Sequence, residues 1–295
     1  MPPSGNLRAI VAMIAACAMF AGMDALLKVL AAHYPPFQVT ALRGLSAMPL
    51  VCLYLLWRGE VRAVFGRRLR WGLHLLRGVV LVVMLALFTF GLKTLGLAEA
   101  YTLSFIAPMI ITMLSVPLLK ESVPARHWVA IAVGLCGVVV ALRPDHGAMR
   151  SAGALAVLAG AVCYALSNVV GRIISRTEPS ATLLFWTTAS MALGGSLVSA
   201  AHWVPVAAVH APVLVGLAIT GFLGQLAIIE AFRHGQASAV APFEYTALAW
   251  AVALDWAVWH AVPAPHTLLG GAIIIVSGIY LIRREAPKEM VVGPA

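Results

Sequence analysis

An acidic and a basic side chain lie inside the first long apolar run of the sequence. In residues 20–35, FAGMDALLKVLAAHYP, Asp24 is followed four residues later by Lys28. A charged group at membrane depth costs about 3 kcal/mol or more unless it faces protein or water, which makes Asp24 a candidate to contact a polar substrate. Because residues four apart share a helix face, an Asp24–Lys28 ion pair is the structural alternative. The two roles are compatible.

The same order of residue types returns in a second apolar run. Four pairs, each 144 residues apart, are Phe20 and Tyr164, Asp24 and Asn168, Lys28 and Arg172, and Pro35 and Pro179. A weaker match joins residues 98–100 to residues 237–239. The pattern indicates a duplicated unit, and we expect Asp24 and Asn168 to form polar elements on opposite sides of one central cavity.

A third group of candidates lies in YTLSFIAP. Tyr101, Ser104, Phe105 and Pro108 are spaced so that they share one helix face. Pro108 removes a backbone hydrogen bond near the middle of the membrane, and such a break is tolerated where neighbours or cavity water satisfy the freed carbonyl. Ordinary aromatic packing around a proline kink is the alternative explanation.

Two polar residues of the second half complete the candidate site. The repeat places Glu244 opposite Phe105 and beside a second break at Pro242. Gln225 lies deeper in its apolar run, where it either contacts substrate or bonds a neighbouring helix. The predicted substrate-binding residues are Phe20, Asp24, Tyr101, Ser104, Phe105, Pro108, Tyr164, Asn168, Gln225 and Glu244.

Four other charged residues lie nearer the ends of apolar runs. They are Arg43, Arg77, Glu230 and Asp255. Pairing with a neighbour or extension of the side chain toward the membrane surface explains charges at such positions, so we favour a structural role for them.

The composition indicates an integral membrane protein. The chain is 62% hydrophobic and 11% charged, with a mean hydropathy of +0.95, whereas soluble domains are roughly one quarter charged. The net charge of +9 does not imply a nucleic-acid partner, because most basic residues lie at the ends of apolar runs, as in cytoplasmic loops. The four Cys residues fall inside apolar runs without paired spacing, so neither a disulfide framework nor a metal site is indicated.

Apolar runs bounded by Pro, Gly or charged residues predict an all-α protein with ten transmembrane helices. The expected spans are residues 7–32, 36–57, 71–93, 98–118, 126–143, 151–173, 181–201, 212–234, 238–259 and 266–284. Little of the chain is then left outside the lipid.

The uneven distribution of basic residues between successive loops predicts the topology. Most Lys and Arg residues fall in alternate loops, such as residues 58–70 and 283–288, which places both termini in the cytoplasm. Spans 1–5 (residues 1–145) are repeated as spans 6–10 (residues 146–295). Because five is odd, the second copy enters the membrane from the opposite side. We therefore expect two inverted five-helix repeats around a central cavity, an architecture that many secondary transporters use for alternating access.

Sequence signatures of enzymes are missing. The chain has no H-E-x-x-H, G-x-S-x-G, Walker or G-x-G-x-x-G motif in a fitting context, so ATP hydrolysis is not expected. A membrane-embedded enzyme acting on lipid-like substrates would cluster acids, His or a nucleophile at one depth, whereas here they spread across both leaflets. No catalytic residue and no cofactor are predicted.

The ten spans and their duplication resemble the EamA-type members of the drug/metabolite transporter superfamily. The residues that carry the resemblance are Pro108, Glu121, Gly134 and Gly137 at the end of the first unit. His260 takes the place of Glu121 in the second half, so a shared role for that acid is not expected. Within the family, the sequence is most similar to YddG-type aromatic amino acid exporters of the bacterial inner membrane.

The resemblance implies a secondary transporter that exports amino acids or related small metabolites, aromatic ones included, from a bacterial-type plasma membrane. Cationic drugs or other metabolites are the alternative cargo. Polar site residues would anchor an amino or carboxylate group, and aromatic residues would hold the side chain. Asp24 or Glu244 could carry a proton, although a facilitative mechanism needs neither. The sequence leaves the substrate and the oligomeric state open.

Overall fold

The computed structural model describes residues 3–66, 69–119, 125–142, 151–175, 177–234 and 241–285, and over these residues the protein is all helical. The long helices are α1 (Pro3–Ala31), α2 (Pro36–Arg58), α4 (Trp71–Leu92), α7 (Ala125–Leu142), α8 (Ala152–Ser175), α9 (Ser180–Ser199), α10 (Ala211–His234) and α13 (Pro265–Glu285). The shorter helices are α3 (Val61–Val64), α5 (Leu97–Ser104), α6 (Ala107–Leu119), α12 (Thr246–Trp259), η3 (Ala200–His202), η4 (Ala208–His210) and η5 (Ala241–Tyr245). Each predicted span contains a helix among the residues that are described.

Six of the described helices are long and apolar enough to cross a membrane, namely α1, α2, α4, α8, α9 and α10. The predicted boundaries agree with the helix ends because Pro and Gly set them. Pro36 begins α2, where its missing N–H costs nothing. Gly59 ends the same helix at φ 68°, a left-handed conformation that glycine adopts without strain. The short helix α3 was not predicted, and Glu121 lies outside the described residues.

Two of the predicted spans are interrupted. The fourth is divided into α5 and α6, and the division falls just before Pro108, which cannot donate a hydrogen bond to the carbonyl of Ser104. The ninth begins with the 3-10 helix η5, which contains Pro242, and continues as α12. Both predicted breaks are therefore present, and each lies beside candidate site residues.

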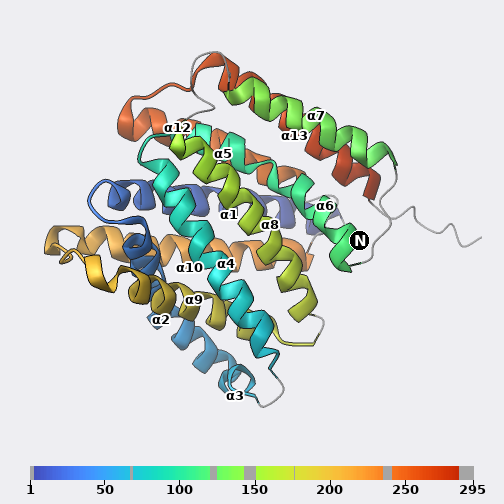
Figure 1. The fold of residues 1–295 in the computed structure, drawn as a ribbon. Helices are drawn as coiled ribbons and strands as arrows, with labels where there is room; N and C mark the ends of the chain where they lie inside the picture. Colours follow the sequence, from blue (N-terminus) through green and yellow to red (C-terminus); the bar gives the residue numbers. More distant parts are fainter. Residues whose placement is uncertain are drawn as a thin grey trace, which may run out of the picture.

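The helices form one bundle with two paired edges (Figure 1). Helices α7 and α13 pack side by side along one edge, and α2 packs against α9 near the opposite edge, with α3 at its tip. Between the edges, α1 packs along α10 and α4 packs along α8. The broken helices α5 and α12 contact each other and lie against α8 and α1, respectively.

Close helix contacts depend on small residues. A Cβ atom on Gly44 of α2 would collide with the backbone of Ala192 in α9, and a Cβ atom on Gly195 would lie 2.6 Å from the backbone nitrogen of Ala41. The two backbones therefore approach each other at these glycines, as small residues allow in membrane helices.

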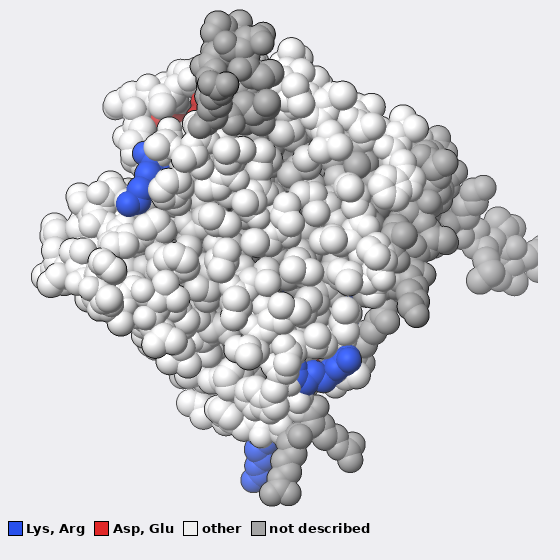
Figure 2. All heavy atoms as spheres, in the orientation of Figure 1, with Lys and Arg blue, Asp and Glu red and all other residues white. Residues whose placement is uncertain are grey.

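One face of the bundle carries few charged side chains among the residues that are described (Figure 2). On the face shown in Figure 2, the described Lys, Arg, Asp and Glu side chains lie near the margins and the broad middle has none. Large apolar side chains such as Leu53, Leu75 and Leu197 are exposed on the bundle. A surface of this kind fits lipid rather than water, which confirms the predicted membrane class.

Candidate functional site

Asp24 is bonded to Tyr101 rather than to Lys28. The Tyr101 hydroxyl in α5 donates a hydrogen bond of 2.7 Å to Oδ2 of Asp24 in α1. Arg43 of α2 is close enough to interact electrostatically with both residues, yet it forms no direct ion pair with Asp24. We call Asp24, Arg43 and Tyr101 the Asp24 group. It brings an acid, a guanidinium and a phenol together inside the bundle from three helices.

Lys28 has a different partner, so the i, i+4 ion pair considered from the sequence is not formed. Nζ of Lys28 lies 3.0 Å from Oδ1 of Asp255 in α12. Oδ2 of Asp255 accepts the backbone N–H of Ala98 at 2.9 Å, and Nζ of Lys28 stands 4.2 Å from the centroid of the Trp259 ring. These contacts join α1, α5 and α12 at one end of the bundle. Asp255 is therefore paired with Lys28, which agrees with the structural role predicted for it.

A second polar group surrounds Tyr164 of α8. Arg77 of α4 and Glu244 of η5 both interact electrostatically with the Tyr164 phenol. Tyr164 is 46% exposed and Glu244 is exposed too, although protein atoms surround both side chains. We call Arg77, Tyr164 and Glu244 the Glu244 group. The Glu244 group therefore places an acid, a guanidinium and an exposed phenol near one another.

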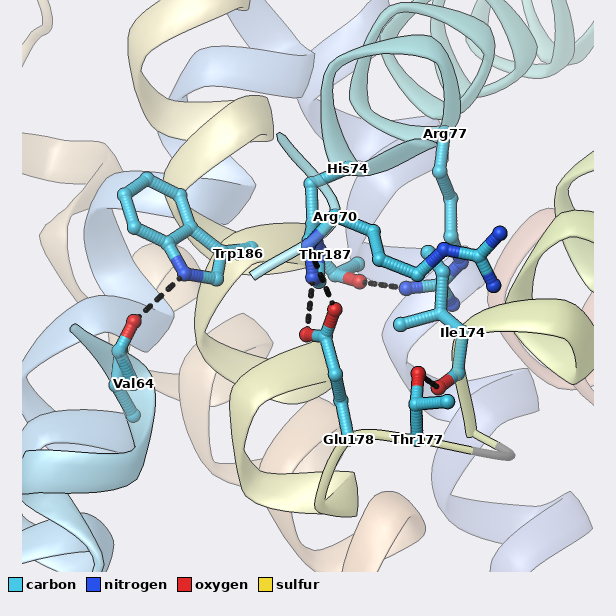
Figure 3. A network of polar contacts seen from close by, with 9 residues as sticks. All are labelled: Val64, Arg70, His74, Arg77, Ile174, Thr177, Glu178, Trp186 and Thr187. Carbon is cyan, nitrogen blue, oxygen red and sulfur yellow. Dashed lines mark hydrogen bonds and ion pairs between the residues drawn. The ribbon is translucent and has the colours of Figure 1, made fainter. Parts of the chain in front are cut away.

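Arg77 is held by its neighbours, as Figure 3 shows. Its Nη1 donates a hydrogen bond of 2.6 Å to Oγ1 of Thr187 in α9, and its Nε approaches the carbonyl of Ser167 at 3.4 Å. A Cβ atom on Gly171 would lie 3.2 Å from Nε, so glycine leaves room for the guanidinium. Helix α4 therefore presents a fixed cation beside Tyr164.

Cys17 and a row of aromatic rings connect the two groups. The Cys17 thiol interacts electrostatically with Tyr101 on one side and with Glu244 on the other, and Sγ lies 3.6 Å from the Glu244 carbonyl oxygen. Ring centroids are 6.2 Å apart between Tyr101 and Phe105 and 5.2 Å apart between Phe105 and Tyr245. Both contacts are edge-to-face, a favourable arrangement of aromatic rings.

The other predicted site residues form fewer contacts with polar groups of other helices. Asn168 donates a hydrogen bond of 2.8 Å to the carbonyl of Tyr164 in its own helix. Phe20 packs on Gly224 of α10, the neighbour of Gln225, and neither Gln225 nor Ser104 has a side-chain hydrogen bond with the residues that are described. The side chain of Pro108 lies outside the described residues. The structure thus brings together Asp24, Tyr101, Phe105, Tyr164 and Glu244 most closely.

Arg43 and Arg77 were not among the predicted site residues, because both lie nearer the ends of predicted spans. Arg43 is the clearer omission, because the shift of 144 residues that relates Asp24 to Asn168 also relates Arg43 to Thr187. Thr187 is the residue that binds Arg77. Applying the repeat to Arg43 could have marked Arg43 and Thr187 as equivalent positions, whereas the contact between Thr187 and Arg77 could not be predicted from the sequence.

A separate network fixes the start of α4 (Figure 3). The buried carboxylate of Glu178 lies 2.6 Å from Nε2 of His74 and accepts the backbone N–H of Arg70 at 2.9 Å. At the other end of the bundle, the Tyr34 hydroxyl lies 2.7 Å from Nδ1 of His210 and accepts the backbone N–H of Ala207. Each contact caps a helix start with a side chain from a turn, which is a structural function.

The arrangement offers ligands for charged and aromatic groups of a small molecule. Within the described part of the chain, no group of three His, Cys, Asp or Glu residues is placed to hold a metal ion. What the site presents instead is two guanidinium groups, two carboxylates and several aromatic rings.

Curated relatives of the chain are transporters. It is 25% identical over 262 residues to an S-adenosylmethionine uptake transporter of Rickettsia conorii, covering 89% of this chain and 88% of that protein. It is 28% identical to the pseudopaline exporter CntI of Pseudomonas aeruginosa, covering 90% and 93% of the two chains. A riboflavin transporter of Vibrio cholerae is 28% identical over 76% of this chain and 75% of its own length.

These names differ from the predicted aromatic amino acid exporters, although they agree with the prediction of a transporter rather than an enzyme. One solved crystal structure superposes with a TM-score of 0.65 at 20% identity, covering 98% of this chain and all of the other, which supports the fold alone. The model of the EamA-like transporter family matches residues 7–143 and again residues 151–284. Since these two matches cover nearly the whole chain, the protein belongs to the EamA-like transporter family.

Proposed function

We propose that the chain is a secondary transporter that moves amino acids or related small metabolites by alternating access. Ten membrane spans, arranged as two inverted repeats, enclose a central cavity lined by the Asp24 group and the Glu244 group. The observation that carries this proposal is the hydrogen bond between Asp24 and Tyr101 beside Arg43, because it turns charged groups of apolar helices toward each other and away from lipid.

Matching helix contacts support the inverted repeats. Helix α1 packs on α10 and α12, and its counterpart α8 packs on α4 and α6, which are the corresponding spans of the other half. The family model also matches twice, within the proposed units 1–145 and 146–295. Pseudo-symmetric exchange of such contacts is how inverted repeats alternate between two openings.

The pair Lys28–Asp255 is suited to close one end of the cavity. The charge pattern of the loops assigns this end to the outside, with both termini in the cytoplasm of a bacterial-type cell, in its inner membrane. Glu244 lies in η5, at the opposite end of α12 from Asp255, and its side chain and that of Tyr164 are exposed. The present arrangement would then be closed to the outside and accessible from the cytoplasm, the state in which an exporter loads its cargo.

The site favours a cargo with both charged and aromatic parts. Amino acids, the aromatic ones included, would place their charged groups on the acids and arginines and a ring against Phe105 or Tyr245. The relatives from Rickettsia favour S-adenosylmethionine as a second candidate, since it joins an amino acid to an aromatic base. Its direction of transport would be uptake rather than export.

Counterflow into liposomes tests the proposal. Vesicles containing the pure protein and an unlabelled metabolite should accumulate the same metabolite in labelled form, with no ATP present. A panel of labelled aromatic and aliphatic amino acids, S-adenosylmethionine and riboflavin would be compared with protein-free vesicles. Exchange of an amino acid or of S-adenosylmethionine is the expected result. Exchange of neither would contradict the proposed function and reopen an enzymatic role.

A further inference from the structure

The two polar groups of the interior are chemically alike but are not related by the repeat. The Asp24 group and the Glu244 group each hold one acid, one tyrosine and one arginine. The repeat would instead give Asn168 for Asp24 and Thr187 for Arg43. The second half therefore lacks the acid and the guanidinium at the equivalent positions. Around Tyr164, the acid comes from Glu244 of the second half and the guanidinium from Arg77 of the first half. A ligand that carries both a negative and a positive charge would explain why an acid and an arginine are present in both groups.

Arg43 is available for a ligand. Protein atoms surround its guanidinium, yet part of the residue remains accessible, and no described residue forms a hydrogen bond or ion pair with that guanidinium. A buried guanidinium without such partners is costly, and a bidentate carboxylate would relieve the cost. Asp24 interacts electrostatically with Arg43 without forming an ion pair, so the two side chains offer opposite charges to a molecule that carries both signs.

Arg77 is prepared in the same way in the other group. Thr187 and Ser167 use its Nη1 and Nε, while Nη2 has no hydrogen bond to any residue that the structure describes. Its planar guanidinium is thus fixed in direction and still offers donors. Glu244 also interacts electrostatically with Tyr164 and supplies the opposite charge.

We propose that the two groups are successive stations for one zwitterionic head group, with Arg43 and then Arg77 binding its carboxylate and Asp24 and then Glu244 binding its cationic group. The rings of Tyr101, Phe105 and Tyr245 lie along the route between the stations, beside Cys17. This assignment rests on the proposed transport function and narrows its cargo to compounds that carry both a carboxylate and a cation.

Two matched pairs of labelled probes test the assignment in liposomes. L-phenylalanine is compared with phenethylamine, and S-adenosylmethionine with its decarboxylated form, so that each pair differs only in the carboxylate. Charge-assisted hydrogen bonds to a guanidinium predict that the carboxylate probe of the exchanged pair is preferred at least about tenfold. No variant is needed for this comparison, so folding defects do not enter.

Variants then test whether Arg43 and Arg77 cause the preference for the carboxylate probe. Arg43→Gln and Arg77→Gln should each reduce the preference for the carboxylate probe to about one, while Arg58→Gln, an exposed arginine at the end of α2, should leave it unchanged. Arg43→Lys should restore only part of it, because an ammonium group lacks the bidentate geometry. The readout is a ratio of two probes, so a loss of total activity alone does not mimic the result.

The outcomes separate the two proposals. Equal exchange of a probe and its decarboxylated partner, or a preference that survives both Arg→Gln changes, would overturn the stations while leaving transport intact. Exchange of none of the four probes, together with no exchange in the metabolite panel, would overturn the proposed function and the stations with it.

Discussion

Lys28 of α1 and Asp255 of α12 form an ion pair across 227 residues of sequence, with Nζ 3.0 Å from Oδ1. Their side chains are 14% and 3% exposed, respectively. The same carboxylate accepts the backbone N–H of Ala98 at the start of α5. One buried acid thus holds three helices from both halves of the chain at one end of the bundle, where a transporter would need a gate.

Removing the charge of Asp255 should destabilise the protein. Asp255→Asn leaves Lys28 buried without its partner, and the loss of one member of a buried pair predicts a decrease of about 3 kcal/mol in the free energy of unfolding. Glu60→Gln is the control, because it breaks the exposed Arg58–Glu60 pair and should cost less than about 1 kcal/mol. Denaturant unfolding in detergent measures both. Equal stability of the two variants would contradict the buried pair.

Tyr101→Phe should weaken substrate binding without disturbing the fold. The change deletes the hydroxyl that donates to Asp24 and leaves the ring against Phe105. A hydrogen bond to a charged group predicts a loss of about tenfold in apparent affinity in counterflow. Tyr54→Phe, in which no hydrogen bond of the described residues is lost, is the matched control. An unchanged affinity in Tyr101→Phe would exclude Tyr101 and Asp24 from the substrate site.

The positions of the helices could be read from the sequence because burial in lipid forces long apolar runs, and Pro and Gly mark their ends. The breaks before Pro108 and at Pro242 were equally predictable from the missing backbone donor. Which side chains pair with each other across the bundle could not be predicted from the sequence. The i, i+4 spacing allowed an Asp24–Lys28 pair, but packing gives Lys28 to Asp255 and Asp24 to Tyr101.

The arginines show a second limit of sequence reasoning. A long side chain near a span end can reach the membrane surface, so position alone cannot tell whether it turns inward. Arg43 and Arg77 turn inward because Asp24 and Thr187, respectively, come from neighbouring helices. Such contacts depend on the tertiary packing of α1, α2, α4 and α9.

The Glu178 network should be a stability element. In Glu178→Gln the amide cannot replace both the acceptor for the Arg70 N–H and the charged partner of His74, so the free energy of unfolding should fall by about 1–3 kcal/mol. Tyr34→Phe removes the matching contact with His210 and should show a loss of the same order. Thermal or denaturant unfolding checks both variants. Losses below about 0.5 kcal/mol in each would assign these contacts no role in stability.

Glu244→Gln tests whether transport is coupled to protons. If the exposed carboxyl takes up a proton in each cycle, the variant should exchange substrate in counterflow but should no longer accumulate it under an imposed pH gradient. Glu60→Gln, a carboxyl outside the site, should retain both activities. If the unaltered protein only equilibrates the substrate, with or without the imposed gradient, transport is facilitated rather than coupled to protons.

Accessibility of Ser104 tests the central claim of a water-filled interior reached alternately from each side. Ser104→Cys, with the four native cysteines changed to serine, would be treated with a membrane-impermeant thiol reagent in vesicles of both orientations. Leu197→Cys, at an exposed apolar position of α9, is the lipid-facing control. The account predicts labelling of Cys at position 104 from both sides and little labelling at position 197. Labelling from neither side, as at position 197, would contradict it.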